Sequence, residues 1–488
     1  MAGEAVMTRR RGSTNPWVVL VLVCFAQFMV VLDATVVNVA LPSIQQDLGL
    51  SEANLQWIIN AYTLVFGGFL LLGGRAGDLL GRKRLFLFGL VVFTIASLLD
   101  GLSQTSGMLI GSRALQGLGA AFISPAALAI ITTTFEEGAE RAKALGVWAA
   151  IAIGGSAVGL IVGGALTQLL SWPWIFFINV PVGIAVFLFA LRDVPESRDE
   201  EAHRSFDVAG AVTVTGGLMT LVYAIVETHQ QGWTSARTLG LFALAAVLLV
   251  AFVVIELRSK APLVRLSIFR VRSLSAANVS MFLVASGLFA MFFFNTLYIQ
   301  QVLGYGPLEA GLAFLPFTAG IMVSAGLASK FAPRVGVRPV AIAGMAVTIV
   351  GMLLLTTISA DGSYVTDVLP GLLLTSLGMG AVFVPLTLIA TTGLDDDDQG
   401  LASGLFNTSQ QIGGALGLAV LTSLAASKTA DATGVSQQEA LVQGFHAAFA
   451  GGAAVVGLAL IAFLVMVRRR DVERIEAEAA ATAPVGTL

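Results

Sequence analysis

Residues 17–41 read WVVLVLVCFAQFMVVLDATVVNVAL, an apolar run of about 25 residues with a single charge, Asp33. Roughly 20 apolar residues in an α-helix cross the hydrocarbon core of a bilayer, so this run is long enough to span it. Arg9, Arg10 and Arg11 precede the run, as they would in a secretion signal. The run is too long for a signal peptide and lacks a small-residue cleavage site, so we predict a retained spanning helix.

The rest of the chain has the same character. Of the 488 residues, 56% are hydrophobic and 12% are charged, about half the charged fraction of a soluble protein. Apolar runs of spanning length lie at 17–41, 54–74, 85–103, 107–134, 144–169, 173–191, 207–227, 237–256, 274–301, 308–329, 338–359, 366–390, 400–425 and 445–467. We predict fourteen spanning α-helices, because lipid leaves backbone polar groups no outside partner and the alternation of a membrane β-barrel is absent.

Positive charge tests this count independently. With the amino terminus in the cytoplasm, 24 of the 27 lysines and arginines fall in cytoplasmic segments. Only Arg237 and Lys428 fall outside, and Arg113 lies within a span. A missed or invented helix would invert every later loop and destroy this asymmetry.

Three motifs recur in order at offsets of about 260 residues, the spacing of an internal repeat. Ile153-Gly154-Gly155 recurs as Ile412-Gly413-Gly414, Gly117-Leu-Gly-Ala-Ala-Phe as Gly378-Met-Gly-Ala-Val-Phe, and the link at Gly81 as a degraded link at Gly336. The repeat predicts two parallel six-helix bundles with two helices inserted between them.

The predicted domains follow from this repeat. They are a cytoplasmic tail (1–16), a first bundle (17–191), a linker with the two inserted spans and an amphipathic cytoplasmic segment (192–273), a second bundle (274–467) and a cytoplasmic tail (468–488).

Several segments resemble the Major Facilitator Superfamily and its fourteen-helix drug:proton antiporter branch. They are Gly74-Arg-Ala-Gly-Asp78-Leu-Leu-Gly81-Arg82-Lys83-Arg84, Leu32-Asp33-Ala-Thr-Val-Val-Asn38-Val-Ala-Leu-Pro42, Arg113-Ala-Leu-Gln116-Gly117, Phe176-Phe-Ile-Asn179-Val-Pro181-Val-Gly183, Tyr298-Ile-Gln-Gln-Val-Leu-Gly-Tyr305 and Gly404-Leu-Phe-Asn407-Thr-Ser-Gln410-Gln411-Ile-Gly-Gly. The resemblance implies an all-α membrane protein with the Major Facilitator fold.

The same resemblance implies a monomeric multidrug exporter of the bacterial cytoplasmic membrane, with both termini in the cytoplasm. It would exchange protons for small amphiphilic compounds, cationic or neutral, with the proton gradient as its energy source and no cofactor. Two positions depart from the family pattern. Gly159-Leu160-Ile-Val-Gly163-Gly164 lacks the usual proline of the fifth helix, and Asn60 stands where some cation exporters have an acid. Gly155, Gly159, Gly163 and Gly164 are still expected to form a helix-packing face.

Asp33 is the only carboxylate well inside a predicted span, and Arg113 lies inside another. An isolated charge in hydrocarbon costs several kcal/mol, so we expect the two to pair and to face a shared aqueous cavity. Asp33 would then be the proton-coupling residue. The alternative is a fixed ion pair that only holds two helices together.

A second candidate set is the cytoplasmic link with Gly74, Asp78, Gly81, Arg82 and Lys83, which would latch the inner ends of the two bundles. The alternative is ordinary positive-inside charge.

A third candidate set combines polar and aromatic side chains that would line a cavity for amphiphilic substrates. Its members are Trp57, Asn60, Tyr62, Gln116, Phe293, Phe294, Asn295, Tyr298, Asn407, Gln410 and Gln411. The alternative for each aromatic residue is that it faces lipid or the protein core.

Other classes of function lack support in the sequence. One cysteine, three scattered histidines and the absence of hydrolase or Walker A motifs argue against an enzyme or a metal site. The run Asp395–Asp398 is better explained as a helix cap than as a metal site, and a net charge of −3 indicates no nucleic-acid partner. Export of one dedicated metabolite, proton-coupled uptake, a non-transporting receptor and a channel remain as alternatives.

Overall fold

The computed structural model describes residues 15–136, 138–198, 207–259, 262–391 and 396–467. Regular secondary structure in these ranges is entirely helical. Fourteen helical segments within them are long and apolar enough to cross a membrane, which confirms the predicted count.

The first half of the chain supplies six of these spans. Its helices are α1 (Pro16–Leu48), the short α2 (Glu52–Leu55), α3 (Trp57–Leu80), α4 (Arg82–Gly101), α5 (Ser106–Thr134), α6 (Ala139–Leu169), and α7 (Trp174–Phe177) with α8 (Asn179–Asp193). The two inserted spans are α9 (Val208–Gln231) and α10 (Ala236–Arg258).

The second half supplies the other six spans. They are α11 (Arg272–Leu297) with the π-helical turn η2 (Tyr298–Val302), α12 (Pro307–Ala313) with α13 (Leu315–Val335), α14 (Val337–Leu355), η3 (Tyr364–Val368) with α15 (Leu369–Thr391), α16 (Asp396–Asp431) and α17 (Gln437–Met466). The short 3-10 helix η1 (Leu266–Arg270) precedes α11.

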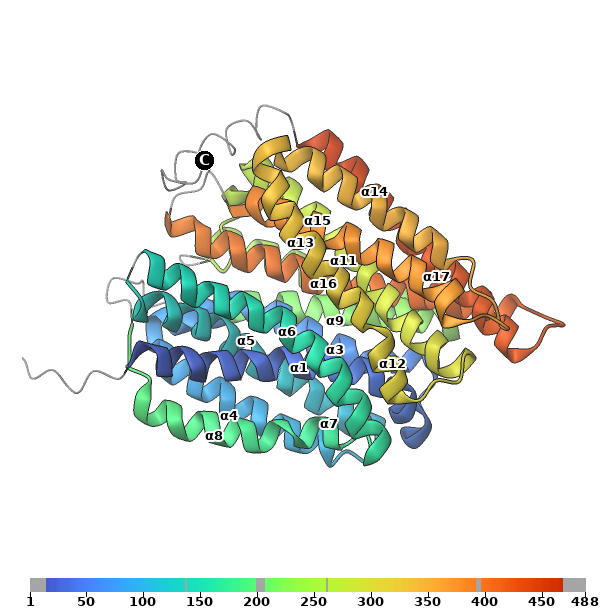
Figure 1. Ribbon diagram of the computed structural model, residues 1–488, viewed down its shortest axis with the longest axis horizontal. Helices are drawn as coiled ribbons and strands as arrows, with labels where there is room; N and C mark the ends of the chain where they lie inside the picture. Colours follow the sequence, from blue (N-terminus) through green and yellow to red (C-terminus); the bar gives the residue numbers. More distant parts are fainter. Residues whose placement is uncertain (1–14, 137, 199–206, 260–261, 392–395, 468–488) are drawn as a thin grey trace, which may run out of the picture.

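The two halves repeat one packing scheme. Helix α6 packs on α1 as α16 packs on α11, and α5 packs on α3 and α4 as α15 packs on α13 and α14. Gly81 and Gly336 form equivalent tight links with φ angles of 108° and 95°, where only glycine avoids strain. In Figure 1 the first half (blue to green) lies below the second half (yellow to red).

Glycines set how closely α6 approaches its neighbours. A Cβ at Gly155 would lie 3.2 Å from the Phe28 ring, and a Cβ at Gly163 would lie 2.8 Å from Val36 Cα, so both glycines pack against α1. Gly159 of α6 also packs against α1, where it faces Thr35. Small residues at this spacing let two membrane helices approach to backbone contact.

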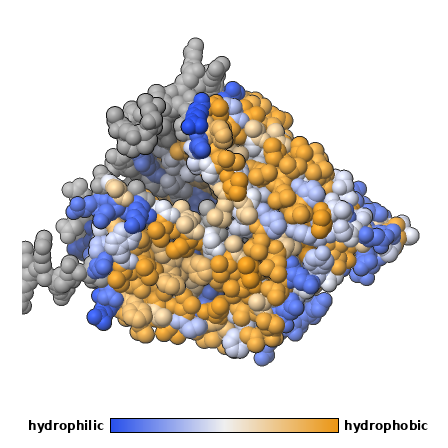
Figure 2. Space-filling model, in the orientation of Figure 1, coloured by the Kyte–Doolittle hydropathy of each residue, from blue (hydrophilic) through white to orange (hydrophobic). Residues whose placement is uncertain are grey.

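The inserted helices cover one side of the interface between the halves. Helix α9 contacts both α3 and α16, and Thr215 of α9 packs against Gly68 of α3. Helix α10 packs on α9 and is largely exposed. Apolar side chains cover the middle of the molecule and polar ones lie at its two ends, as expected of a membrane protein (Figure 2).

The linker before α11 packs several of its apolar side chains against the protein. Leu263, Val264 and Ile268 are buried in the main hydrophobic cluster, and only Phe269 presents a large exposed apolar surface. Most of the apolar side chains of this segment therefore bind it to the protein instead of to a lipid surface.

Candidate functional site

A cavity of about 1200 Å³ lies between the two halves. The first half contributes side chains from α1, α3, α5 and α6, and the second contributes them from α11 and α16. The polar and charged lining residues are Gln27, Thr35, Asn38, Tyr62, Thr63, Arg75, Arg113, Ser124, Thr132, Ser156, Arg265, Gln399, Ser403, Asn407, Gln410 and Gln411. The aromatic ones, besides Tyr62, are Phe66, Trp148, Phe289 and Phe292. This mixture suits amphiphilic ligands.

The cavity is open at one end of the molecule. Its lining there includes Arg75 near the end of α3, Thr132 near the end of α5, and Gln399 and Ser403 near the start of α16. Arg75, Gln399 and Ser403 are exposed. We call this the open end.

At the opposite, closed end, η2 is hydrogen-bonded to α1 of the other half. Gln300 Nε2 donates to Val39 O at 2.8 Å, and Gln301 Nε2 donates to Gln45 Oε1 at 2.8 Å. These bonds seal the cavity on this side because they hold the ends of the two bundles together.

Helix α6 adds a second closing contact at the same end. Gln168 Oε1 accepts a hydrogen bond from Leu308 N at 3.0 Å. A Cβ at Gly164 would lie 2.5 Å from Pro307 O and 2.7 Å from Leu308 Cα. The backbones of α6 and α12 therefore touch across the two halves.

Asp33 and Arg113 form the buried ion pair that the sequence predicts. Arg113 Nη1 lies 2.6 Å from Asp33 Oδ2. Gln116 Nε2 and Asn179 Nδ2 donate to Asp33 Oδ1 at 2.8 and 3.0 Å. Arg113 also donates to Gln116 Oε1, and its Nε donates to Ile58 O at 3.1 Å. A buried charge pair needs such additional bonds to offset its desolvation.

The expectation that both charges face the cavity is only half met. Arg113 lines the cavity, with the Tyr62 ring 4.4 Å from its guanidinium carbon. Asp33 is fully buried and does not line the cavity. Its carboxylate is enclosed because α4, α5 and α8 all supply polar side chains to the cluster around it, through Ser97, Gln116 and Asn179. Gln116 accordingly lies in this cluster and does not line the cavity.

Three residues of the site were not assigned from the sequence. Asn179 and Ser97 complete the cluster, with Asn179 Nδ2 donating to Ser97 Oγ at 3.0 Å. Asp100, one turn after Ser97, is a second buried carboxylate, and its Oδ1 accepts a 2.6 Å bond from Ser112. The sequence contained evidence for these residues. Asn179 lies in one of the segments that resemble the superfamily, and Ser97 and Asp100 are three residues apart, which places them on one face of a helix.

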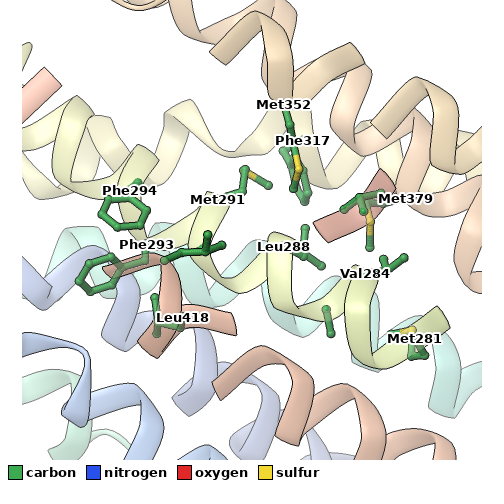
Figure 3. Packing of buried hydrophobic residues seen from close by; sticks show 14 of the residues in the cluster. Met281, Val284, Leu288, Met291, Phe293, Phe294, Phe317, Met352, Met379 and Leu418 are labelled. Carbon is green, nitrogen blue, oxygen red and sulfur yellow. The ribbon is translucent and has the colours of Figure 1, made fainter. Parts of the chain in front are cut away.

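The aromatic candidates on α11 belong to the protein core, which corrects the prediction for them. Phe293 and Phe294 are buried and line no part of the cavity (Figure 3). The Phe294 ring packs 5.5 Å from that of Phe445 on α17. Phe289 and Phe292, on the adjacent face of the same helix, line the cavity instead.

Asn295 and Tyr298 are also core residues and not cavity residues. Asn295 Nδ2 donates to Met291 O of its own helix at 2.8 Å, and Tyr298 Oη donates to Ser359 O at 2.7 Å. Both side chains are fully buried. Neither side chain lines the cavity, and the Oδ1 atom of Asn295 is buried without a hydrogen-bond partner among the described residues.

The two other misplaced candidates lie on α3. Trp57 packs in a cluster with α9, with its ring 6.2 Å from that of Tyr223. Asn60 Nδ2 donates to Gln56 Oε1 at 3.3 Å and is fully buried. The inserted helix α9 packs against α3, whereas the prediction considered only the two bundles.

The polar stripe on α16 lies where the sequence places it. Asn407, Gln410 and Gln411 all line the cavity. None of the three side chains has a hydrogen-bond partner among the described residues. Their amide groups are therefore available to a ligand.

The cytoplasmic link of the family signature is bound within the first half. Lys83 Nζ donates to Leu191 O at 2.8 Å, Lys83 N donates to Glu196 Oε1 at 3.2 Å, and Arg82 N donates to Ser197 O. Gly74 lines the cavity. The segment after α8 thus covers the link, a contact that the sequence did not reveal.

Two predicted acidic features cannot be described: the side chain of Asp78, and the run Asp395–Asp398, of which Asp395 and the side chains of the other three aspartates lie outside the described part of the chain. Within the described part of the chain, no group of three or more His, Cys, Asp or Glu side chains is placed to hold a metal ion.

A family model of the Major Facilitator Superfamily matches residues 23–418. The chain belongs to this superfamily. It is therefore a multi-pass membrane transporter rather than an enzyme.

Several relatives of this Major Facilitator protein are named as resistance or export proteins. It is 42% identical to the puromycin resistance protein pur8 of Streptomyces alboniger. The 417 aligned residues cover 85% of this chain and 82% of that protein. It is 40% identical to the cephamycin export protein CmcT of Amycolatopsis lactamdurans, over 88% of both chains. It is 37% identical to the multidrug resistance protein Stp of Mycobacterium tuberculosis, over 82% of this chain and 74% of that one.

Solved structures agree on the fold. A bacterial homologue of the lysosomal transporter Spinster, in an inward-facing conformation, superposes with a TM-score of 0.65 at 15% identity, over 94% of this chain and 98% of that one. An auto-inhibited peptide transporter of the POT family superposes with a TM-score of 0.66 at 17% identity, over 92% of this chain and 97% of that one.

Proposed function

We propose that this Major Facilitator protein exports amphiphilic, drug-like compounds from the cytoplasm in exchange for protons, by alternating access. The observation that carries the proposal is the buried Asp33–Arg113 pair at the edge of a cavity between two repeated bundles. An intramembrane ion pair is costly and usually functional. The names of the relatives support the direction of transport and the class of substrate.

We place the protein in the bacterial cytoplasmic membrane with its open end toward the cytoplasm. The open end carries Arg75, Arg82, Lys83 and Arg265, and lysine and arginine favour cytoplasmic segments. With this orientation the structure is inward-facing, ready to accept a substrate from the cytoplasm.

The geometry suggests how a proton is coupled to movement. Asp33 joins α1 to α5 through Arg113 and Gln116, and to α8 through Asn179. Protonation of Asp33 removes the charge attraction across the 2.6 Å contact and weakens all of these bonds. Helix α1 is then less tightly held to its own bundle.

Helix α1 also carries the residues that close the outer end. Val39 O and Gln45 accept bonds from η2, and they lie within four turns of Asp33 on the same helix. Protonation at Asp33 therefore acts on the same helix that holds the outer gate. Opening that gate would release the substrate outside, and loss of the proton to the cytoplasm would restore the inward-facing state.

The test is Asp33→Asn in proteoliposomes, with the neutral fluorescent amphiphile 1-pyrenebutyramide as the probe. Asparagine keeps the size of the side chain and cannot exchange a proton. We expect accumulation driven by a pH gradient to be lost, and probe exchange without a gradient to persist. Asp47→Asn, an exposed position on the same helix, is the matched control. Gradient-driven accumulation by Asp33→Asn at the control rate would refute proton coupling at this residue.

A second candidate is export of one dedicated antibiotic. Two relatives, pur8 and CmcT, are named for a single compound, which favours it. Cells that lack other pumps and express this chain would then resist one compound only. Resistance to several unrelated compounds, abolished by an uncoupler, would favour the multidrug function.

A further inference from the structure

The charged residues described on the cavity wall are all arginines. Among the described residues that line it, Arg75, Arg113 and Arg265 are charged and no aspartate or glutamate is present. A cationic ligand loses water on entering a cavity and needs a carboxylate or several aromatic faces in return. The described lining offers no carboxylate for that purpose.

The nearest acid behind the wall is not available to a ligand. Both oxygens of Asp33 are engaged, Oδ2 with Arg113 and Oδ1 with Gln116 and Asn179. The side chain is fully buried. Arg113, its partner in the ion pair, borders the cavity but is only 1% exposed, so the pair offers neither of its charges to a ligand.

Two features at the wall recognise groups without positive charge. The amides of Asn407, Gln410 and Gln411 have no partner among the described residues and can donate and accept hydrogen bonds. Phe289 and Phe292 supply flat apolar surface beside them. An aromatic ligand with carbonyl, hydroxyl or amide groups satisfies both features.

The open end adds an electrostatic preference. Arg75 is exposed at the cavity lining and forms no ion pair with another described residue. The charge within the described lining therefore attracts anionic ligands and disfavours cationic ones.

We propose that the cavity selects amphiphiles that are uncharged or anionic and disfavours cations. This proposal rests on the proposed export function and narrows its substrate class, which the sequence alone gave as cationic or neutral. It has an electrical consequence. Exchange of one proton for a neutral molecule moves one positive charge into the cell, whereas exchange for a monovalent cation moves none.

The test uses three probes with the same aromatic body: 1-pyrenebutyric acid, 1-pyrenebutyramide and 1-pyrenebutylamine. At neutral pH their head groups are anionic, neutral and cationic. Binding to the purified full-length protein in detergent is measured by fluorescence titration without any gradient. We expect the acid and the amide to bind at least about tenfold more tightly than the amine.

An added carboxylate should reverse the order. Asn407→Asp places a negative charge on the cavity wall, and we expect it to tighten amine binding and weaken acid binding by about tenfold each. Gln437→Glu adds the same charge at an exposed position outside the cavity and should change neither. Equal binding of the three probes, tighter binding of the amine, or no binding of any probe would overturn the proposal.

The outcome is independent of proton coupling. If the amide binds tightly and a pH gradient fails to drive its transport, the export function fails and the selectivity stands. If a gradient drives the amine and the amine binds most tightly, the selectivity fails and the export function stands.

Discussion

In the proposed orientation, Gly164→Ala should push this transporter out of the inward-facing state. Gly164 of α6 touches the backbone of α12 at the closed end, and a Cβ there would lie 2.5 Å from Pro307 O and 2.7 Å from Leu308 Cα. Both partners are backbone atoms, which a change of side-chain rotamer cannot move. The two halves must therefore separate by about half an ångström or more at this point, since Cβ contacts under 3.0 Å are essentially never seen.

The size of the effect follows from packing energetics. Inserting a methyl group into a close-packed contact typically costs about 1–3 kcal/mol. The contact joins the two halves only while the outer end is closed, so the outward-facing state avoids this cost. The equilibrium between the two states should then shift toward the outward-facing one by about 5- to 150-fold.

Labelling of a single cysteine measures the shift. Ser403→Cys, exposed at the open end, is placed in a background in which the buried Cys24 is replaced by serine. A membrane-impermeant maleimide is added to inside-out vesicles. We expect Gly164→Ala to slow labelling of this cysteine several-fold, because the outward-facing state closes the cytoplasmic entrance.

A matched control lies on the same helix. A Cβ at Gly154 would meet no atom within 4 Å, so Gly154→Ala should leave the labelling rate unchanged. If Gly164→Ala labels as fast as Gly154→Ala, the contact between α6 and α12 does not set the conformational equilibrium and the reasoning is wrong.

Three further predictions concern the core, the ion pair and the outer gate. Phe293→Ala should cost about 3–5 kcal/mol of stability, whereas Phe289→Ala should cost less and mainly weaken probe binding; thermal unfolding in detergent and fluorescence titration separate the two. Arg113→Ala should destabilise the protein by about 3–5 kcal/mol, because it leaves Asp33 buried without a cation, and adding Asp33→Asn should restore much of the melting temperature; no recovery would argue against the pair as the cause. Gln168→Ala removes one closing hydrogen bond worth about 0.5–1.5 kcal/mol and should raise the outward-facing population about 2- to 12-fold, read by the same cysteine labelling.

The membrane class, the number of spans and the family could all be read from the sequence. They depend on run length, charge asymmetry and local motifs, which are properties of short segments and survive without knowledge of the fold. The ion pair was also predictable, because two opposite charges inside apolar spans have few alternatives to meeting each other. The stripe of Asn407, Gln410 and Gln411 was predictable because helical spacing puts all three on one face.

Rotation of each helix about its own axis was not predictable. Helical periodicity relates residues of one helix to each other, but the direction that a face points is set by packing against neighbouring helices. On α11 the observed rotation places Phe289 and Phe292 at the cavity. Phe293 and Phe294, which the sequence analysis selected, are buried in the core. On α3 the inserted helix α9 covers Trp57, a contact between segments about 160 residues apart.

The sequence by itself determined that a buried carboxylate and a buried arginine exist in this membrane protein, because their cost in lipid requires a partner. Only the tertiary structure decided which of the two borders the cavity. Helices α4, α5 and α8 converge on Asp33 and seal it, while Arg113 reaches the cavity. Which member of the pair borders the cavity therefore depends on how several helices pack, and this cannot be read from any local sequence pattern.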